Sequence, residues 1–250
     1  MPHFTSYFRD QIYNLRHIHG EVAAMKNGLF INKPPMPGWN DYSPSNFLYA
    51  FVCFNTLYDI DWESSCHDGS MVRYRDEEKD NGDRFYESDM QENYIHFCFS
   101  NDDFVECYKP YFIRFILTEW RGDISRVTDI IKGVRFREQF KDGFIKNFEN
   151  LLSGNFEEKT VQEITNSLYH VRCNIFHGTK TIKDLGRGEQ QKRLSIYTSF
   201  FIALNQMLFS YLDYKNPSVD FAKQIEEDFQ NLTKKRRIAN RYIGKPQPTK

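Results

Sequence analysis

The stretch FLYAFVCFNTLYDI, residues 47–60, decides the fold class, because it is apolar on nearly every side when it is wound as a helix. Its length exceeds that of an ordinary buried strand, so it predicts a central helix that neighbours cover on several faces. The preceding stretch NKPPMPGWNDYSPS, residues 32–45, holds four prolines and one glycine and is expected to be an irregular connection.

Helical periodicity continues on both sides of this segment, with apolar residues recurring at spacings of three and four. Pro110 lies inside another apolar run, which predicts two helices that meet at a bend. The same periodicity predicts further helices over residues 4–29, 134–152, 159–176, 189–211 and from Pro217 onward.

Residues 64–93 are densely charged and show little periodicity, which predicts an irregular, solvated excursion, and residues 94–99 predict a short strand or a turn of helix. The sequence contains neither strand–helix alternation nor a glycine-rich phosphate loop. We therefore expect an all-α fold, a helical bundle with a long irregular charged excursion. Residues 1–215 are expected to form a single helical domain, and residues 216–250 a C-terminal helix and basic tail.

The composition is that of a globular chain with a core rich in aromatic rings. Of the 250 residues 40% are hydrophobic, and the 23 Phe and 15 Tyr residues favour ring packing. The 33 basic and 34 acidic residues give a net charge of −1, which excludes a globally basic nucleic-acid coat. The five scattered cysteines form no CxxC pair, and neither a signal peptide nor a membrane span is indicated, so we expect a cytoplasmic protein.

One segment, SLYHVRCNIFHGTK at residues 167–180, combines residue types that do chemistry. At about 100° per residue, Arg172 falls between two apolar stripes, and a buried guanidinium needs an acceptor or an anion. His170, Asn174 and His177 share the remaining face. The two stripes consist of Ile164, Leu168, Val171 and Ile175, and of Tyr169, Cys173 and Phe176.

These residues also have an ordinary structural interpretation. A histidine near the C-terminus of a helix often interacts with the helix dipole and the last carbonyl groups, which would account for His177. An arginine between apolar stripes often forms a salt bridge, here with Asp59 or Asp61. The residue types alone leave both interpretations open.

The sequence RCNIFHG, residues 172–178, resembles the R-x4-H signature of the HEPN superfamily (higher eukaryotes and prokaryotes nucleotide-binding domain), in particular its RNA-targeting branch. The FNTLY segment at residues 54–58 resembles the buried early helix of that family, and the helix from Glu189 resembles the one that follows the motif. Cys173 stands where relatives often have a polar residue.

The resemblance implies a metal-independent endoribonuclease of the kind used in defence or in toxin-like growth control, with RNA as its partner and no metal or other cofactor. Arg172 and His177 are implied as the catalytic residues, because a fork-shaped cation suits a phosphate and an imidazole suits proton transfer near neutral pH. Asn174 and Asn55 are implied as supporting residues. The alternative is a non-catalytic HEPN-like module that binds RNA or nucleotides or acts as a scaffold, or a helical interaction protein.

Two further expectations concern partners. Five residues of separation place Arg172 and His177 about 140° apart around a helix, so a second copy related by a two-fold axis would complete a shared site. The resemblance to the superfamily likewise implies a homodimer with a composite site. The basic run near the C-terminus suits contact with the RNA backbone and consists of Lys234, Lys235, Arg236 and Arg237.

Overall fold

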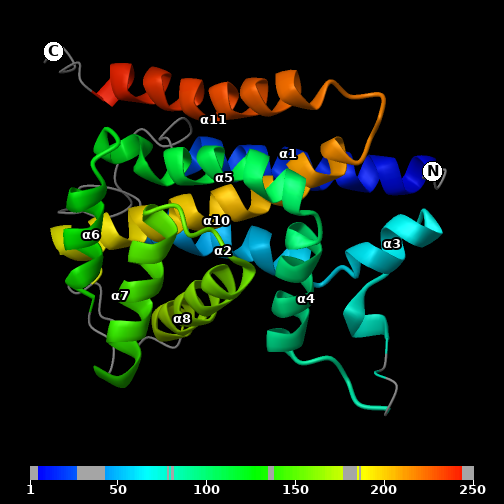
Figure 1. Ribbon diagram of the computed structural model, residues 1–250, viewed down its shortest axis with the longest axis horizontal. Helices are drawn as coiled ribbons and strands as arrows, with labels where there is room; N and C mark the ends of the chain where they lie inside the picture. Colours follow the sequence, from blue (N-terminus) through cyan, green and yellow to red (C-terminus); the bar gives the residue numbers. More distant parts are fainter. Residues whose placement is uncertain are drawn as a thin grey trace, which may run out of the picture.

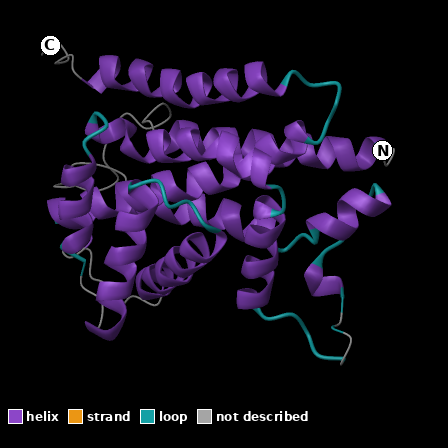
Figure 2. Cartoon of the chain, viewed as in Figure 1, coloured by secondary structure: helices purple, strands orange, loops and turns teal. Residues whose placement is uncertain are grey.

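The computed structural model describes residues 5–26, 43–77, 79, 82–134, 138–176, 185 and 187–243. Every regular element among these residues is helical, and Ile60 and Arg73 form an isolated β-bridge (Figures 1 and 2). The protein is therefore all-α, as the sequence predicts. The elements in chain order are α1 (Ser6–Lys26), α2 (Ser43–Tyr58), α3 (Trp62–Asp68), the 3-10 turn η1 (Tyr74–Asp76), α4 (Glu87–Phe99), α5 (Asp102–Leu117), η2 (Thr118–Trp120), α6 (Ile124–Lys132), α7 (Glu138–Leu152), α8 (Glu158–Phe176), α10 (Gly188–Tyr214) and α11 (Phe221–Ile243).

The central element is α10, which runs through the middle of the bundle beside α1, α2 and α5 (Figure 1). Almost every residue of its middle is buried, including small polar ones such as Asn205 and Ser199. Neighbouring helices donate hydrogen bonds to its backbone, from the Tyr108 hydroxyl to Ala203 O at 2.9 Å and from the Tyr94 hydroxyl to Leu204 O at 3.3 Å. These bonds satisfy tyrosine hydroxyls that would otherwise be buried without a partner.

The helix predicted over residues 47–60 is α2, and its inner faces bury a cluster of aromatic rings against α10. Phe51 and Phe54 each lie 5.1 Å from the ring centroid of Phe201, within the distance at which aromatic pairs attract. The outer face of α2 leaves Tyr49 50% and Val52 49% exposed. The prediction that neighbours cover this helix on several faces therefore holds for its inner side, and its outer side is partly exposed. The most enclosed helix is α10.

The charged excursion is shorter than predicted, because α3 and α4 extend into residues 64–93 from both sides. Asp61 caps α3 by accepting a hydrogen bond from Ser64 N at 3.0 Å, and Gly69 ends the helix with φ of 68°, a value that favours glycine. Trp62 is 1% exposed and donates a hydrogen bond to Leu57 O at 2.8 Å. Residues 94–99 form the last turns of α4, so the alternative of a short strand there is wrong.

The predicted bend at Pro110 is also wrong, because α5 continues through it. Pro110 is exposed, and so is Glu106, whose carbonyl would have bonded the missing N–H. Buried rings on either side, Tyr108 and Phe112, hold both halves of the helix against the core. Packing therefore outweighs the local cost of the proline.

The last helix, α11, begins at Phe221 and not at Pro217, because Asp220 accepts a hydrogen bond from Lys223 N at 3.3 Å and caps it there. Its first half packs on α5, where Phe229 is buried beneath the Arg114 guanidinium at 3.7 Å from the ring centroid. The helix α6 was not predicted. Within the described part of the chain, no helix is long and apolar enough to cross a membrane.

Candidate functional site

The helix α8 carries Arg172 near its C-terminal end, and its faces follow the predicted pattern. Leu168 and Val171 are buried against the core, while His170 and Asn174 are exposed on another side. The helix packs mainly against α7 and α4. Its register therefore places Arg172 at the border between core and surface, where it is half-buried.

Two aromatic rings lie beside the Arg172 guanidinium. Its central carbon lies 5.5 Å from the ring centroid of Phe51 in α2 and 5.7 Å from that of Tyr169, one turn earlier in α8. These distances are in the range of cation–π attraction. Nη1 also points toward the Cys173 sulfur at 3.8 Å. The rings therefore restrain the guanidinium, whose Nε is buried, while Arg172 as a whole is half-buried.

The two carboxylates suggested as ordinary salt-bridge partners of Arg172 are engaged by other groups. Asp59 accepts from Arg73 at 2.9 Å and pairs with Arg75 at 3.1 Å. Asp61 bonds Ser64 and caps α3.

A carboxylate that the sequence analysis missed, Glu87, joins three helices beside Arg172. It is the first residue of α4, and its Oε2 accepts a hydrogen bond from the Tyr169 hydroxyl at 2.8 Å. Its Oε1 contacts the Tyr58 hydroxyl of α2, which also contacts the amide oxygen of Asn55. We call Asn55, Tyr58, Glu87, Tyr169 and Arg172 the Arg172 cluster.

Burial and electrostatics within the Arg172 cluster raise the pKa of both tyrosines further above neutral pH. Burial, followed by the hydrogen bond and negative charge of Glu87, raises the pKa of Tyr58 far above its usual value. The nearby charge of Arg172 opposes that rise, which places the guanidinium within electrostatic reach of the Tyr58 hydroxyl. The hydrogen bond to Glu87 is the main cause that raises the pKa of Tyr169. Both hydroxyls therefore act as donors to one carboxylate.

The structure places some of the predicted site residues together and leaves others undescribed. Asn55 lies in the Arg172 cluster, and Asn174 lies on the exposed face of α8. His177 lies outside the described residues, as does Gly178 at the end of the motif. The backbone of the basic run at residues 234–237 belongs to α11, but its side chains are not among those described.

Tyr58 and Glu87 belong to the Arg172 cluster but were not predicted from the sequence as site residues, and the sequence signal for them differs. Tyr58 lies three residues after Asn55 in FNTLY, so helical spacing alone puts the two side chains on one face. Glu87 gave no signal, because it lies among many charged residues and its partners are distant in sequence.

Among the described residues, no three His, Cys, Asp or Glu side chains are grouped so that they could hold a metal ion. Comparison of the chain with protein-family models, curated proteins and solved structures finds no match.

Proposed function

We propose that the protein is a metal-independent endoribonuclease whose reaction centre is built on Arg172 and His177. The observation that carries this proposal is the half-buried Arg172, whose guanidinium lies beside the rings of Phe51 and Tyr169 near the end of α8, five residues before a histidine in the sequence. A cation in this setting suits a phosphate, and the imidazole of that histidine is assigned proton transfer.

The proposed reaction uses a nucleophile that RNA itself carries. The 2′-oxygen attacks the adjacent phosphorus, its proton passes to a base, and the 5′-oxygen leaves with a proton, so that a 2′,3′-cyclic phosphate remains. The His177 imidazole is assigned the proton transfer, and Arg172 neutralises the charge that develops on the phosphoryl oxygens. No step requires a side-chain nucleophile or an electron carrier.

The hydrogen bonds of Glu87 support the proposal by holding the wall of the site. Because Glu87 accepts from Tyr169, it fixes the ring that lies against the Arg172 guanidinium. The contact of Glu87 with Tyr58 ties the same carboxylate to α2, which supplies Phe51. Glu87 and Tyr58 are therefore assigned as positioning residues and not as catalytic ones.

We further propose that two copies of the chain share the site, because the five-residue spacing, if helical, would put Arg172 and His177 about 140° apart. Tyr169 is not available to a partner, because its hydroxyl binds Glu87 of its own chain and its ring packs near Phe51. The exposed face of α8 with His170 and Asn174 is therefore the better surface for the second copy.

The test compares cleavage of unstructured RNA, with excess chelator present, by the wild-type protein and by Arg172→Ala and His177→Ala. Each variant is expected to lose about 100-fold or more of the activity, the usual contribution of a positioned acid, base or charge. Arg84→Ala and His17→Ala serve as matched controls on exposed positions and are expected to stay within about twofold.

Near-normal turnover by either site variant would contradict the assignment. A strict requirement for a divalent ion would contradict the proposed mechanism. Intact RNA that is nevertheless bound by the protein would contradict the nuclease and fit the non-catalytic binding module instead.

A further inference from the structure

A cleft of about 1090 Å³ lies between α3, η1 and the C-terminal parts of α4 and α10, and it shares no residue with the Arg172 cluster. Its volume is typical of small-molecule sites. Six of the nineteen residues that line the cleft carry aromatic rings, and most of the others are polar or charged. The rings belong to Trp62, Tyr74, Phe85, Tyr94, Phe97 and Tyr211.

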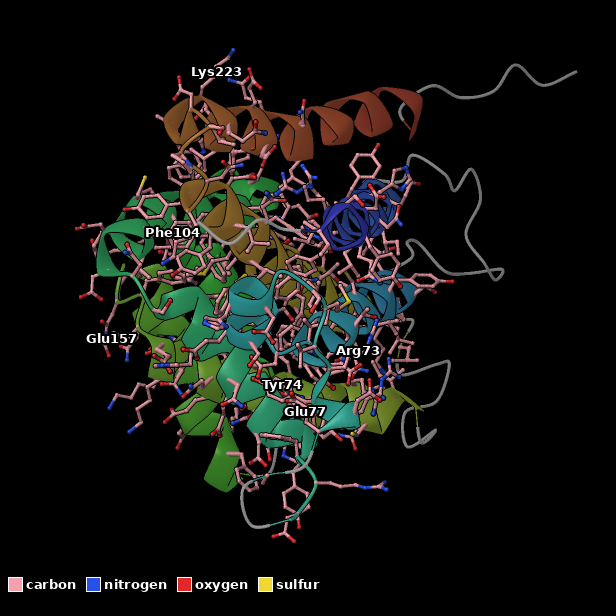
Figure 3. All side chains as sticks on the ribbon, turned by 90° about the vertical axis from the view of Figure 1, so that its right-hand side faces the viewer. Arg73, Tyr74, Glu77, Phe104, Glu157 and Lys223 are labelled. Carbon is pink, nitrogen blue, oxygen red and sulfur yellow. The ribbon has the colours of Figure 1, made fainter. Side chains whose placement is uncertain are left out.

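One end of the cleft carries negative charge. Asp61 and Glu63 line it beside Tyr74, whose pKa is raised to about 12 by burial first and then by Asp61 and other carboxylates. Burial and the charge of Asp61 likewise raise the pKa of Glu77, which lies next to Tyr74 on this side of the molecule (Figure 3). The nearby cation Arg73 is already bound to Asp59 and does not offset this charge.

The other end of the cleft carries positive charge. The Lys215 ammonium lies 5.3 Å from the ring centroid of Tyr211, and its charge opposes the burial that raises the pKa of Cys66 to about 11. A hydrogen bond of 3.1 Å from Thr5 N to Gly69 O brings the first turn of α1, with Arg9, to the end of α3. Within the described part of the chain, neither Lys215 nor Arg9 forms a salt bridge.

The helix α4 gives a scale for the length of the cleft. Asn93 of α4 lines the cleft near Tyr74 at the acidic end and opposes the rise that burial causes in the pKa of that tyrosine. Ser100, which caps the same helix, bonds the Tyr211 hydroxyl at 2.7 Å at the basic end. Seven residues at 1.5 Å each separate these two anchors by about 10 Å.

We propose that this cleft binds a short peptide with free termini, its ammonium group beside Asp61 and Glu63, its carboxylate beside Lys215 and Arg9, and an aromatic side chain against the ring-lined floor. An extended tripeptide spans about 10 Å, which is comparable with the length of α4 between Asn93 and Ser100 along the cleft. A mononucleotide matches less well, because its phosphate finds cations but the acidic end then faces no positive group.

The experiment measures by calorimetry the binding of glycyl-phenylalanyl-glycine in four forms: free, N-acetylated, C-amidated and blocked at both ends. The free form is expected to bind most tightly, and each block is expected to raise Kd about tenfold, or about 1.4 kcal/mol. In the Glu63→Gln variant, N-acetylation of the peptide should raise Kd by less than about threefold, whereas C-amidation should still raise Kd about tenfold. In the Arg9→Gln, Lys215→Gln double variant, C-amidation should have the small effect on Kd and N-acetylation the large one.

The matched control is Lys223→Gln, an exposed position on α11 away from the cleft, which should reproduce the wild-type pattern (Figure 3). Arg172→Ala should also bind the free peptide normally, so that failure here and failure of the proposed nuclease are separable. The proposal is overturned if none of the four peptides binds, if blocking the termini changes nothing, or if adenosine monophosphate binds in this cleft and the peptides do not.

Discussion

At the scale of single residues, Glu87 has the widest influence on the candidate site, because one carboxylate accepts from tyrosines of two other helices. Hydrogen bonds to a charged group contribute about 1.5–3 kcal/mol each. We expect Glu87→Gln and Tyr169→Phe each to lower the free energy of unfolding by about 1–2 kcal/mol. The double variant should lose less than the sum, with a coupling of about 0.5–2 kcal/mol in denaturant titrations.

The control for this cycle is Glu92→Gln, which changes an exposed carboxylate on the same helix and should leave stability within about 0.5 kcal/mol. Strict additivity of Glu87→Gln and Tyr169→Phe would show that the hydrogen bond does not stabilise the fold.

The guanidinium of Arg172 also predicts that an arginine and a lysine at this position differ in RNA cleavage rate. Lysine keeps the charge but lacks the planar fork that stacks on rings and binds two phosphate oxygens. Arg172→Lys is therefore expected to fold with near-normal stability and to lose about tenfold or more of the RNA cleavage rate. Equal rates for the arginine and lysine proteins would mean that charge alone is used, and thermal unfolding of both proteins checks that the fold is retained.

At the scale of elements, α5 contains a proline that its neighbours tolerate. Pro110→Ala restores a backbone hydrogen bond at an exposed position and removes a steric conflict of about 3 kcal/mol, while the unfolded chain gains about 1 kcal/mol of entropy. We expect the free energy of unfolding to rise by about 1–2 kcal/mol. A clear loss of stability in the same denaturant titration would show that the helix depends on the ring of Pro110.

The elements also show what the sequence can and cannot predict. The faces of α8 were predictable, because helical periodicity places Leu168 and Val171 inward from local spacing alone. The burial of Trp62 and Tyr74 was not, because both lie in or beside a charged stretch without apolar periodicity, and they contact Leu57 and Phe85, which no helical spacing relates to them. The position of Glu87 was missed for the same reason, since its role depends on tertiary contacts.

At the scale of the whole molecule, the buried tyrosines predict how the protein responds to alkali. Burial raises the pKa values of five of them in the folded state, so the unfolded chain releases these protons at a lower pH than the native protein. The stability that they contribute is present below about pH 10 and is lost as the pH rises beyond it. The five are Tyr58, Tyr74, Tyr94, Tyr108 and Tyr197.

We therefore expect these tyrosines to ionise together with the loss of helix, as followed by tyrosinate absorbance and circular dichroism in one pH titration. Full ionisation of all tyrosines with the helix signal intact would contradict the buried arrangement.

A shared site predicts complementation between inactive chains. When Arg172→Ala and His177→Ala chains are mixed in equal amounts and allowed to exchange, about half of the dimers are heterodimers with one complete site of two, so the mixture should recover up to about a quarter of the wild-type activity. An active monomer in light scattering would contradict the shared site, as would a mixture no more active than its separate components.

The most direct measurement of the central claim uses oligonucleotides with randomised flanks that contain one ribonucleotide in a DNA chain, incubated with the protein and excess chelator. A twin set carries a 2′-O-methyl group at that position. Attack by the 2′-oxygen predicts cleavage only after the ribonucleotide, with a 2′,3′-cyclic phosphate end, and an intact methylated twin. Equal cleavage of both sets, or cleavage of neither under conditions where the protein is folded, would contradict the account.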